Sequence, residues 1–260
     1  MTKAPRFHCP AVLVPGSTID LDAGAARHVQ VLRLQPGDRI TLFGGHASGL
    51  EQADNAASDA PDGEFEARIV EMGRRDVRVT IESFRTASRE PVREVCLAIG
   101  VPANERMDWL VEKATELGVS LIQPLMTERT VVRLEEERAR KKTAHWESIA
   151  IAACEQCGRN RVPVIRPVVA LASWAHPFDR LLGAETGRFL LSLHPDARPL
   201  RQVLDGQAVR GRVTILAGPE GGLSPAEELL VLGQGFESVS LGPRVLRSET
   251  AALVALTLLT

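Results

Sequence analysis

Several functions are excluded by what this 260-residue chain lacks. It contains no tyrosine and only 4% aromatic residues, which argues against recognition of a single-stranded nucleic acid by stacking many bases. No stretch reaches the roughly 18 apolar residues of a membrane span, and the N-terminal sequence MTKAPRFHCP lacks the apolar run of a signal peptide. We therefore expect a cytoplasmic protein without a membrane partner.

Cysteine is also scarce. Cys9, Cys96, Cys154 and Cys157 are too few and too scattered for a disulfide framework. Cys154 and Cys157 form a C-x-x-C pair, a spacing found in redox and zinc sites. Both fall on the apolar face of an expected helix, however, and no second cysteine pair or nearby histidine pair supplies the remaining ligands. We expect free thiols and no metal.

The chain has little net charge. Its formal charge is -2 and its pI is about 6.3, so the chain as a whole does not attract a polyanion and any such partner must meet a local basic surface. Between Arg129 and Arg166, nine basic and five acidic residues give a local charge of +4. A charged run of this kind is more often a solvated helix face than a binding site.

The first 85 residues have the pattern of a small β-rich domain. Short alternating segments are separated by turn signals, while residues 44–63 are rich in glycine, alanine, serine and aspartate and predict a mobile loop. The polar stretch Thr86–Glu94 contains Pro91 and is the expected domain boundary. The strand candidates are Arg39–Phe43, Glu64–Val70 and Val77–Ile81.

From residue 92 to residue 260 the pattern changes to alternating strands and helices. This alternation predicts an α/β domain with a parallel sheet. One helix is expected to begin after Asn104 as its N-cap and to end at Gly118, and a second to run from Glu135 to Cys157. The apolar face of the second helix comprises Trp146, Ile149, Ala150, Ala153, Cys154 and Cys157. The strand candidates are Val95–Gly100, Leu121–Met126, Arg188–Leu193, Arg212–Ala217 and Ser238–Leu241.

A glycine-rich turn between a strand and a helix is the first informative motif. It runs from Leu216 to Glu227 (LAGPEGGLSPAE), and Ser224, Pro225 and Glu227 predict a capping box at the start of the helix. Such a turn presents backbone N–H groups at the carboxyl end of a strand, where α/β proteins bind ligands. The glycines fit a tight connection without a ligand equally well.

The second motif repeats this arrangement. It runs from Leu241 to Ala251 (LGPRVLRSETA), with a turn at Gly242 and Ser248 as the expected N-cap of an apolar helix. Taken alone, Glu249 also fits a first-turn charge that complements the helix dipole, and Arg247 fits a surface cation. The two motifs together predict two neighbouring ligand-binding turns.

These motifs resemble a known family when they are taken together. The pattern GPEGGLS-x-x-E followed by LG-x-RVLR-x-ETA is similar to the cofactor-binding knot of the SPOUT methyltransferases. Further segments resemble the RsmE family of 16S rRNA uridine-N3 methyltransferases. They are RHVQVLRLQPGDRI at Arg27–Ile40, KATELGV at Lys113–Val119, P-x-x-T-x-R at Pro124–Arg129 and ACEQCGR at Ala153–Arg159. Cys157 and Leu223 depart from the pattern, where a small polar residue and an aromatic residue are usual.

The resemblance implies an enzyme of two domains. Residues 1–85 would form a PUA-like β-barrel that binds RNA, and residues 92–260 a SPOUT-type α/β domain with a C-terminal trefoil knot. The cofactor would be S-adenosyl-L-methionine, and the substrate N3 of a uridine in 16S rRNA within the small ribosomal subunit. The resemblance also implies a homodimer whose active sites take residues from both protomers, with the helix from Trp146 to Cys157 in the interface.

The resemblance also implies which residues form the site. Glu155, Arg159 and Arg247 are candidates for removing the N3 proton or for stabilising the anion that develops on O2 and O4, although Glu155 and Arg159 also fit an ordinary i,i+4 surface pair. The candidate RNA contacts, chosen from the distribution of basic residues, are Arg27, Arg33, Arg129, Arg133 and Arg161. The implied cofactor contacts are Leu193, Leu216, Ala217, Gly218, Pro219, Glu220, Gly221, Gly222, Leu241, Gly242, Val245, Leu246, Arg247, Glu249, Thr250 and Ala251.

Other functions stay open at this point. A SPOUT enzyme could methylate a different RNA atom, such as a ribose 2′-oxygen. An RNA-binding ribosome assembly factor could keep the fold without turnover. A nucleotide-dependent oxidoreductase is disfavoured because no G-x-G-x-x-G follows a strand and no G-x-x-x-x-G-K-[ST] is present.

Overall fold

The chain folds into two compact units. The computed structural model describes residues 4–45, 62–103, 105–131, 135–175, 187–206 and 211–260. The first unit comprises residues 1–90 together with 151–162, and the second comprises residues 91–150 together with 163–260. The division at Glu90 and Pro91 falls inside the polar stretch described above, but nothing in the sequence pattern indicated that residues 151–162 would pack with the first unit.

The first unit is built on a five-stranded sheet in the order β1-β3-β4-β5-β2. β1 pairs with β3 in parallel and the other neighbours are antiparallel. The predicted β-rich domain is therefore confirmed, whereas the helix α1 and the short strands β1 and β2 were not predicted. The elements are β1 Arg6–His8, β2 Thr18–Asp20, α1 Ala23–Val31, β3 Arg39–Phe43, β4 Gly63–Met72 and β5 Val77–Thr86. Most of the predicted loop at 44–63 lies outside the described residues.

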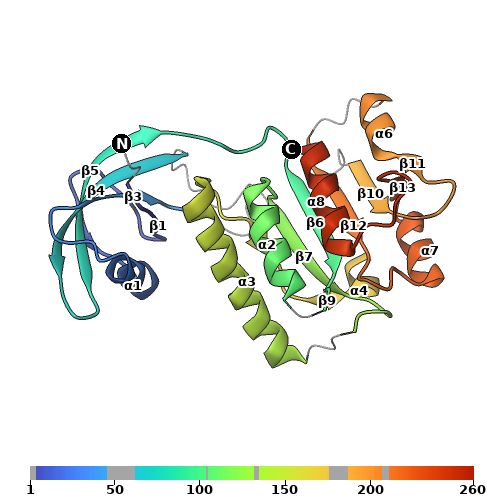
Figure 1. Cartoon of the computed structure of the whole chain (residues 1–260), viewed down its shortest axis with the longest axis horizontal. Coiled ribbons are helices and arrows are strands. Elements are labelled where there is room, and N and C mark those ends of the chain that lie inside the picture. The colour runs from blue at the N-terminus through green and yellow to red at the C-terminus, as the bar shows by residue number, and fades with distance from the viewer. Residues whose placement is uncertain (1–3, 46–61, 104, 132–134, 176–186, 207–210) are drawn as a thin grey trace. The chain divides into compact units, whose positions relative to one another are not determined.

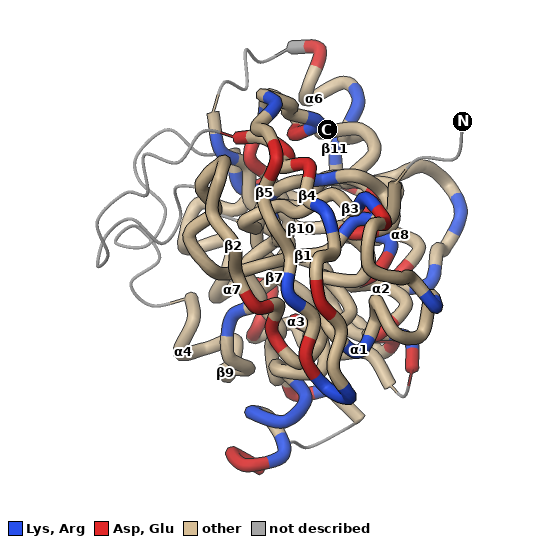
Figure 2. The backbone as a smooth tube through the Cα atoms, turned by 90° about the vertical axis from the view of Figure 1, so that its left-hand side faces the viewer, with Lys and Arg blue, Asp and Glu red and all other residues tan. Residues whose placement is uncertain are grey.

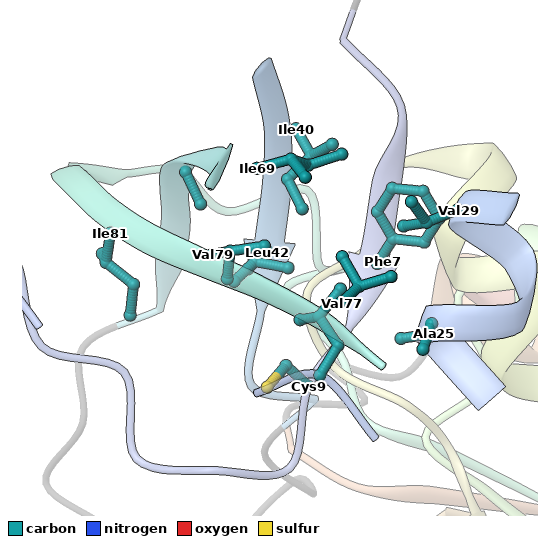
Figure 3. Close-up of a cluster of buried hydrophobic side chains, with 13 residues drawn as sticks. Phe7, Cys9, Ala25, Val29, Ile40, Leu42, Ile69, Val77, Val79 and Ile81 are labelled. Atoms are coloured by element: carbon teal, nitrogen blue, oxygen red, sulfur yellow. The ribbon is translucent and has the colours of Figure 1, made fainter. Parts of the chain in front are cut away.

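One hydrophobic core holds this unit together. Figure 3 shows Phe7 from β1, Ala25 and Val29 from α1, and side chains of β3, β4 and β5 meeting in a single cluster. Along β5, Val77 and Val79 are fully buried, because alternate side chains of a strand face the same side of the sheet.

Three helices end in the same hydrogen-bond pattern. After α1 the N–H of Leu34 donates to the carbonyl of Val29, five residues earlier, at 3.3 Å. A hydrogen bond with this spacing defines a Schellman motif. The motif needs a residue with positive φ just beyond the helix, where glycine is favoured. After two helices of the second unit, that position is filled by Gly118 and Gly235, with φ of 93° and 82°. After α1 it is filled by Arg33, with φ of 57°.

The second unit is an α/β structure on an eight-stranded sheet in which every pair is parallel. Its main path runs β11-β13-β10-β12-β6-β7-β8, and β9 pairs with β7. The predicted α/β class with a parallel sheet is confirmed. The strands are β6 Val95–Gly100, β7 Leu121–Met126, β8 Val164–Ile165, β9 Val169–Ala170, β10 Gly187–Leu191, β11 Arg198–Pro199, β12 Val213–Ala217 and β13 Glu237–Ser240.

Helices complete the second unit, as Figure 1 shows, and α2 packs beside α8. The capping box predicted at the start of α7 is present. Two other predicted caps are corrected: Glu105 occupies the N-cap of α2, with Asn104 outside the described residues, and Arg247 occupies the N-cap of α8, so that Ser248 is already helical. The helices are α2 Arg106–Glu116, α3 Glu136–Cys157, α4 Leu171–Ala175, α6 Leu200–Gly206, α7 Pro225–Gly233 and α8 Ser248–Leu259.

Helix α3 buries most of its predicted apolar face. Trp146, Ala150, Ala153 and Cys154 are buried within this chain, whereas Ile149 and Cys157 are only partly buried. Burial raises the pKa of the Cys154 thiol to about 12, so this thiol stays protonated and is a poor nucleophile or metal ligand. All four cysteines are free, as predicted. Among the described residues, no helix is long and apolar enough to cross a membrane.

Candidate functional site

A cavity of about 560 Å³ lies at the carboxyl ends of three neighbouring strands of the second unit. Its wall includes residues 191–193 at the end of β10, 217–223 at the end of β12, and 241–242 and 244–248 after β13. Because β10 lies between β12 and β13 and all three strands are parallel, their carboxyl ends meet at one edge of the sheet. The two turns predicted from the sequence thus flank a third turn, and together they enclose one cavity.

Main-chain atoms form much of the turn after β12. The N–H of Gly222 donates to the carbonyl of Pro219 at 2.8 Å, and Gly222 has φ of 68°. A Cβ on Gly218 would lie 2.9–3.0 Å from backbone atoms of Gly222 and Leu223. Gly100, at the end of β6, is equally confined, because a Cβ there would lie 2.7 Å from the nitrogen of Pro219. Only glycine fits these two positions without moving the backbone.

Most of the predicted cofactor contacts come together in this cavity. Leu216 does not line it, because its side chain is fully buried in β12, and Glu249 and Thr250 instead line a neighbouring cavity beside α8. The predicted contacts that line the first cavity are Leu193, Ala217, Gly218, Pro219, Glu220, Gly221, Gly222, Leu241, Gly242, Val245, Leu246, Arg247 and Ala251.

Among the cavity residues that the sequence analysis missed are two arginines, Arg106 and Arg244, and the first of them depends on the strand order. Arg106 begins α2 after β6, which neighbours β12 in the sheet. It donates to Glu220 at 2.9 Å, and the N–H of Ala103 donates to the same carboxylate at 2.9 Å. Glu220 therefore ties the glycine turn to the start of α2. Arg244 also lines the cavity, and its place in the second motif was the available signal.

Arg129 is held over the cavity by the capping box of α7. The buried Glu227 carboxylate accepts from the N–H of Ser224 at 2.9 Å and, with its other oxygen, from the N–H of Glu128 at 2.8 Å. The next residue, Arg129, donates to the carbonyl of Gly221 at 2.8 Å. One carboxylate thus fixes both the helix start and the segment that carries Arg129.

Replacing this carboxylate tests the arrangement. Glu227→Gln is expected to lower the free energy of unfolding by about 1–3 kcal/mol, because the amide NH₂ would face a buried N–H and leave it without an acceptor. Urea unfolding measures the loss. The matched control is Glu228→Gln, which removes no side-chain hydrogen bond among the described residues and should change stability by less than about 0.5 kcal/mol. Equal losses in both variants would contradict this role.

The three catalytic candidates occupy different surroundings. Glu155 belongs to the first unit, where its oxygens bind the N–H of His8 at 3.0 Å and Nδ1 of His28 at 3.1 Å. Arg159 is buried in the same unit and donates to Glu90 at 2.6 Å. Arg247 alone of the three lines the cavity. It makes no side-chain hydrogen bond or ion pair with any described residue.

Glu64 is the centre of a buried ionic network in the first unit. It pairs with Arg6, Arg85 and Arg89, and Arg6 also donates to Asn160 Oδ1 at 2.8 Å and to the carbonyl of Arg159 at 3.0 Å. Burial raises the pKa of Glu64, but the three arginines outweigh burial and hold that pKa below its ordinary value. The ACEQCGR segment and the two residues after it are therefore fastened to the sheet of the first unit.

The candidate RNA contacts are also dispersed. Arg27 and Arg33 are exposed on and just after α1, and Arg129 lines the cavity. Arg161 pairs with Asp62 in the first unit, and Arg133 lies outside the described residues. No group of three or more potential metal ligands is found in the part of the chain that the structure describes.

Comparison with known proteins shows the class of protein, an RNA methyltransferase, because the family model for an RNA methyltransferase domain matches residues 88–260. The ribosomal RNA small subunit methyltransferase E of Bacillus subtilis is 30% identical to this chain over 233 residues, covering 88% of this chain and 83% of that protein. The crystal structure of the same enzyme from Neisseria gonorrhoeae, bound to S-adenosyl methionine, is 34% identical, with a TM-score of 0.85 over 98% of this chain and 96% of that one. A methyltransferase structure from Legionella pneumophila with bound cofactor SAM is 37% identical, with a TM-score of 0.85, and covers 99% and 97% of the two chains. The chain therefore belongs to the ribosomal RNA small subunit methyltransferase E family.

Proposed function

We propose that this protein transfers a methyl group from S-adenosylmethionine to N3 of a uridine in 16S rRNA. The observation that carries the proposal is the cavity enclosed by the turns after β10, β12 and β13. Two relatives of similar fold were solved with this cofactor bound. A volume of about 560 Å³ lies within the usual range for sites that enclose a small molecule, about 300–1,000 Å³.

The turns can bind the cofactor mainly through the backbone. A flat adenine needs apolar contact on its faces and hydrogen bonds at its edge, and backbone N–H and C=O groups supply the hydrogen bonds. Gly218 and Gly221 expose the backbone of one turn, and Leu241 and Leu246 offer apolar contact from another. Bound there, S-adenosylmethionine supplies an electrophilic methyl group.

Arg247 is the residue that we assign to the reaction itself. Transfer to N3 converts the cofactor to S-adenosylhomocysteine and requires the loss of the N3 proton to solvent, which leaves negative charge on O2 and O4 of the uracil ring. A fixed cation beside these oxygens stabilises that charge in the transition state. Arg247 lines the cavity and has no anionic partner among the described residues, so its guanidinium is available. The carboxylate of Glu155 and the guanidinium of Arg159 are already engaged within the first unit.

We also propose a homodimer, the assembly that the family resemblance implies. On the helix that we expect in the interface, Trp146, Ala150, Ala153 and Cys154 are buried within this chain, so the interface would be formed by the residues of α3 that are exposed or partly exposed. Light scattering at micromolar concentration should give twice the mass of one chain. A monomer that methylates at the full rate would contradict the dimer.

Arg33 offers a test of RNA binding that separates binding from stability. Arg33→Gly is expected to weaken RNA binding, because it removes an exposed cation. It should also raise the free energy of unfolding by about 1 kcal/mol, because a residue with a Cβ is strained at φ of 57° and glycine is not. Filter binding and urea unfolding measure the two effects. Unchanged RNA affinity would remove Arg33 from the binding surface. Arg27→Gly would not separate the two effects, because Arg27 lies within α1 and glycine inside a helix lowers stability.

Primer extension tests the proposed reaction. Methylation at N3 blocks Watson–Crick pairing, so small-subunit rRNA from cells that contain the protein should give a stop. The stop should vanish in cells lacking the protein and return with the wild-type chain but not with Arg247→Ala. Methylation at a ribose 2′-oxygen would appear instead in nucleoside analysis, and a chain that binds no S-adenosylmethionine in calorimetry would be an assembly factor rather than an enzyme.

A further inference from the structure

A second cavity, of about 830 Å³, adjoins the first in the second unit. The two cavities share Arg106 and Arg247. The second is lined by α2, by the first turns of α3 and by the start of α8. Four basic residues and two acidic residues line it, so its walls carry a net positive charge. The residues that matter here are Arg106, Trp109, Arg138, Lys142, Arg247 and Glu249.

Three of the cations have no anionic partner in the part of the chain that the structure describes. They are Arg138, Lys142 and Arg247. Arg138 and Lys142 are four residues apart on α3, a spacing at which like charges repel. The adjacent Lys141, by contrast, pairs with Glu137 at 2.7 Å. In Figure 2 the start of α3, at the bottom of the view, changes from red to blue within its first turns.

Within the described residues, neither acidic residue of the cavity, Glu105 or Glu249, forms an ion pair with these cations. Arg106 is the cation closest to Glu249, at 3.9 Å, and it also donates to Glu220 at 2.9 Å. Glu249 is buried and accepts from Ser248 Oγ at 3.3 Å. Arg138 and Lys142 are left to interact with an anion that comes from outside the chain.

Trp109 places an exposed indole in the same cavity. The core-facing side of α2 is formed by Met107, Leu110 and Val111, whereas Trp109 stays 46% exposed. The buried Trp146, in contrast, donates its indole N–H to Asp108 at 2.9 Å. An exposed aromatic face beside unpaired cations matches a nucleotide, since the base stacks and the phosphates bind the cations.

We propose that this second cavity binds a nucleotide of the RNA next to the uridine that is methylated. Trp109 stacks on its base, Arg138 and Lys142 bind the flanking phosphates, and Arg247 stands at the junction with the first cavity. The proposal deepens the proposed function and rests on it for the identity of the RNA. It names the residues by which the α/β unit itself holds its substrate.

The test uses the full chain, small ribosomal subunits from cells lacking the protein, and S-adenosylmethionine. Trp109→Leu should raise the Kd for the subunits about tenfold, within the range measured when one stacked base no longer has its aromatic partner. Arg138→Gln combined with Lys142→Gln should weaken binding and lower the slope of log Kd against log salt by about 0.7–0.9 for each phosphate that is no longer neutralised. The Kd for S-adenosylmethionine should not change in either variant.

Lys141→Gln is the matched control, because it removes a neighbouring cation of α3 that is already paired and should leave subunit binding unchanged. A rise in the Kd for S-adenosylmethionine, or an equal loss of subunit binding in the control, would overturn the proposal. Dissociation of a dimer by Trp109→Leu would also overturn it and make the surface an interface with a second copy. If the wild-type chain binds no S-adenosylmethionine, the proposed reaction fails, whereas the loss of RNA affinity still reports on this cavity.

Discussion

Gly218→Ala is expected to weaken binding of S-adenosylmethionine at least tenfold. The added Cβ would lie 2.9–3.0 Å from the carbonyl carbon and Cα of Gly222 and from the nitrogen of Leu223. These are backbone atoms that cannot rotate away, so the turn after β12 must shift by a few tenths of an ångström. Because that turn forms one wall of the first cavity, the shift weakens the packing and the hydrogen bonds around the adenosyl group. Isothermal titration calorimetry measures the affinity.

Gly233→Ala is the matched control for this substitution. A Cβ at Gly233, at the end of α7, meets no atom within 4 Å, and the residue does not have positive φ. The control should bind the cofactor as the wild-type chain does. If both alanine variants bind equally well while remaining folded, the turn after β12 is not a wall of the cofactor site.

Glu64→Gln is expected to cost about 3–5 kcal/mol of unfolding free energy. The substitution leaves the buried Arg6 without its charged partner, and breaking a buried ion pair from one side costs that much. Glu71→Gln is the control on the same strand, because Glu71 pairs with Arg78 at 2.9 Å while its side chain is 69% exposed. An exposed pair contributes at most about 1 kcal/mol. Urea unfolding at neutral pH compares the two, and equal losses would mean that the network contributes no more than a surface pair.

The stabilisation by Glu64 should also depend on pH. Its pKa in the folded chain lies below the ordinary value of 4.5, so the ionised carboxylate stabilises the fold fully above pH 4.5 and progressively less as the pH falls through the folded pKa. The difference in stability between the wild-type chain and Glu64→Gln should therefore shrink in acid. A difference that grows below pH 4.5 would reverse the sign of this argument.

The sequence predicted those strands whose pattern is both long and buried. β3, β6 and β7 were placed at their observed bounds, since five or six residues with mostly apolar side chains at the buried positions suffice to show a strand. β8, β9 and β11 have two residues each, too few to show any periodicity. These short strands are defined by pairing with partners that the local sequence does not reveal.

The same distinction holds for the site. The glycine turns and the capping box were found because their signals lie within four residues of one another. The surroundings of Glu155 were not predicted, because its partner His28 is 127 residues away in the sequence. Likewise, Arg106 joins the first cavity only because β6 neighbours β12 in the sheet. Contacts between residues that are far apart in the sequence depend on the topology of the fold. Composition and motif spacing do not predict that topology.

Residues 151–162 have a practical consequence for anyone who dissects this protein. The carbonyl of Arg159 and the side chain of Asn160 accept hydrogen bonds from Arg6. A fragment that stops at residue 90 would therefore remove two hydrogen-bond acceptors of the Arg6 guanidinium. Expressing the N-terminal module alone should give an aggregating product. A fragment that works would need residues 151–162 grafted back, by co-expression or through a designed linker, so this module cannot be exchanged between enzymes at a single crossover point.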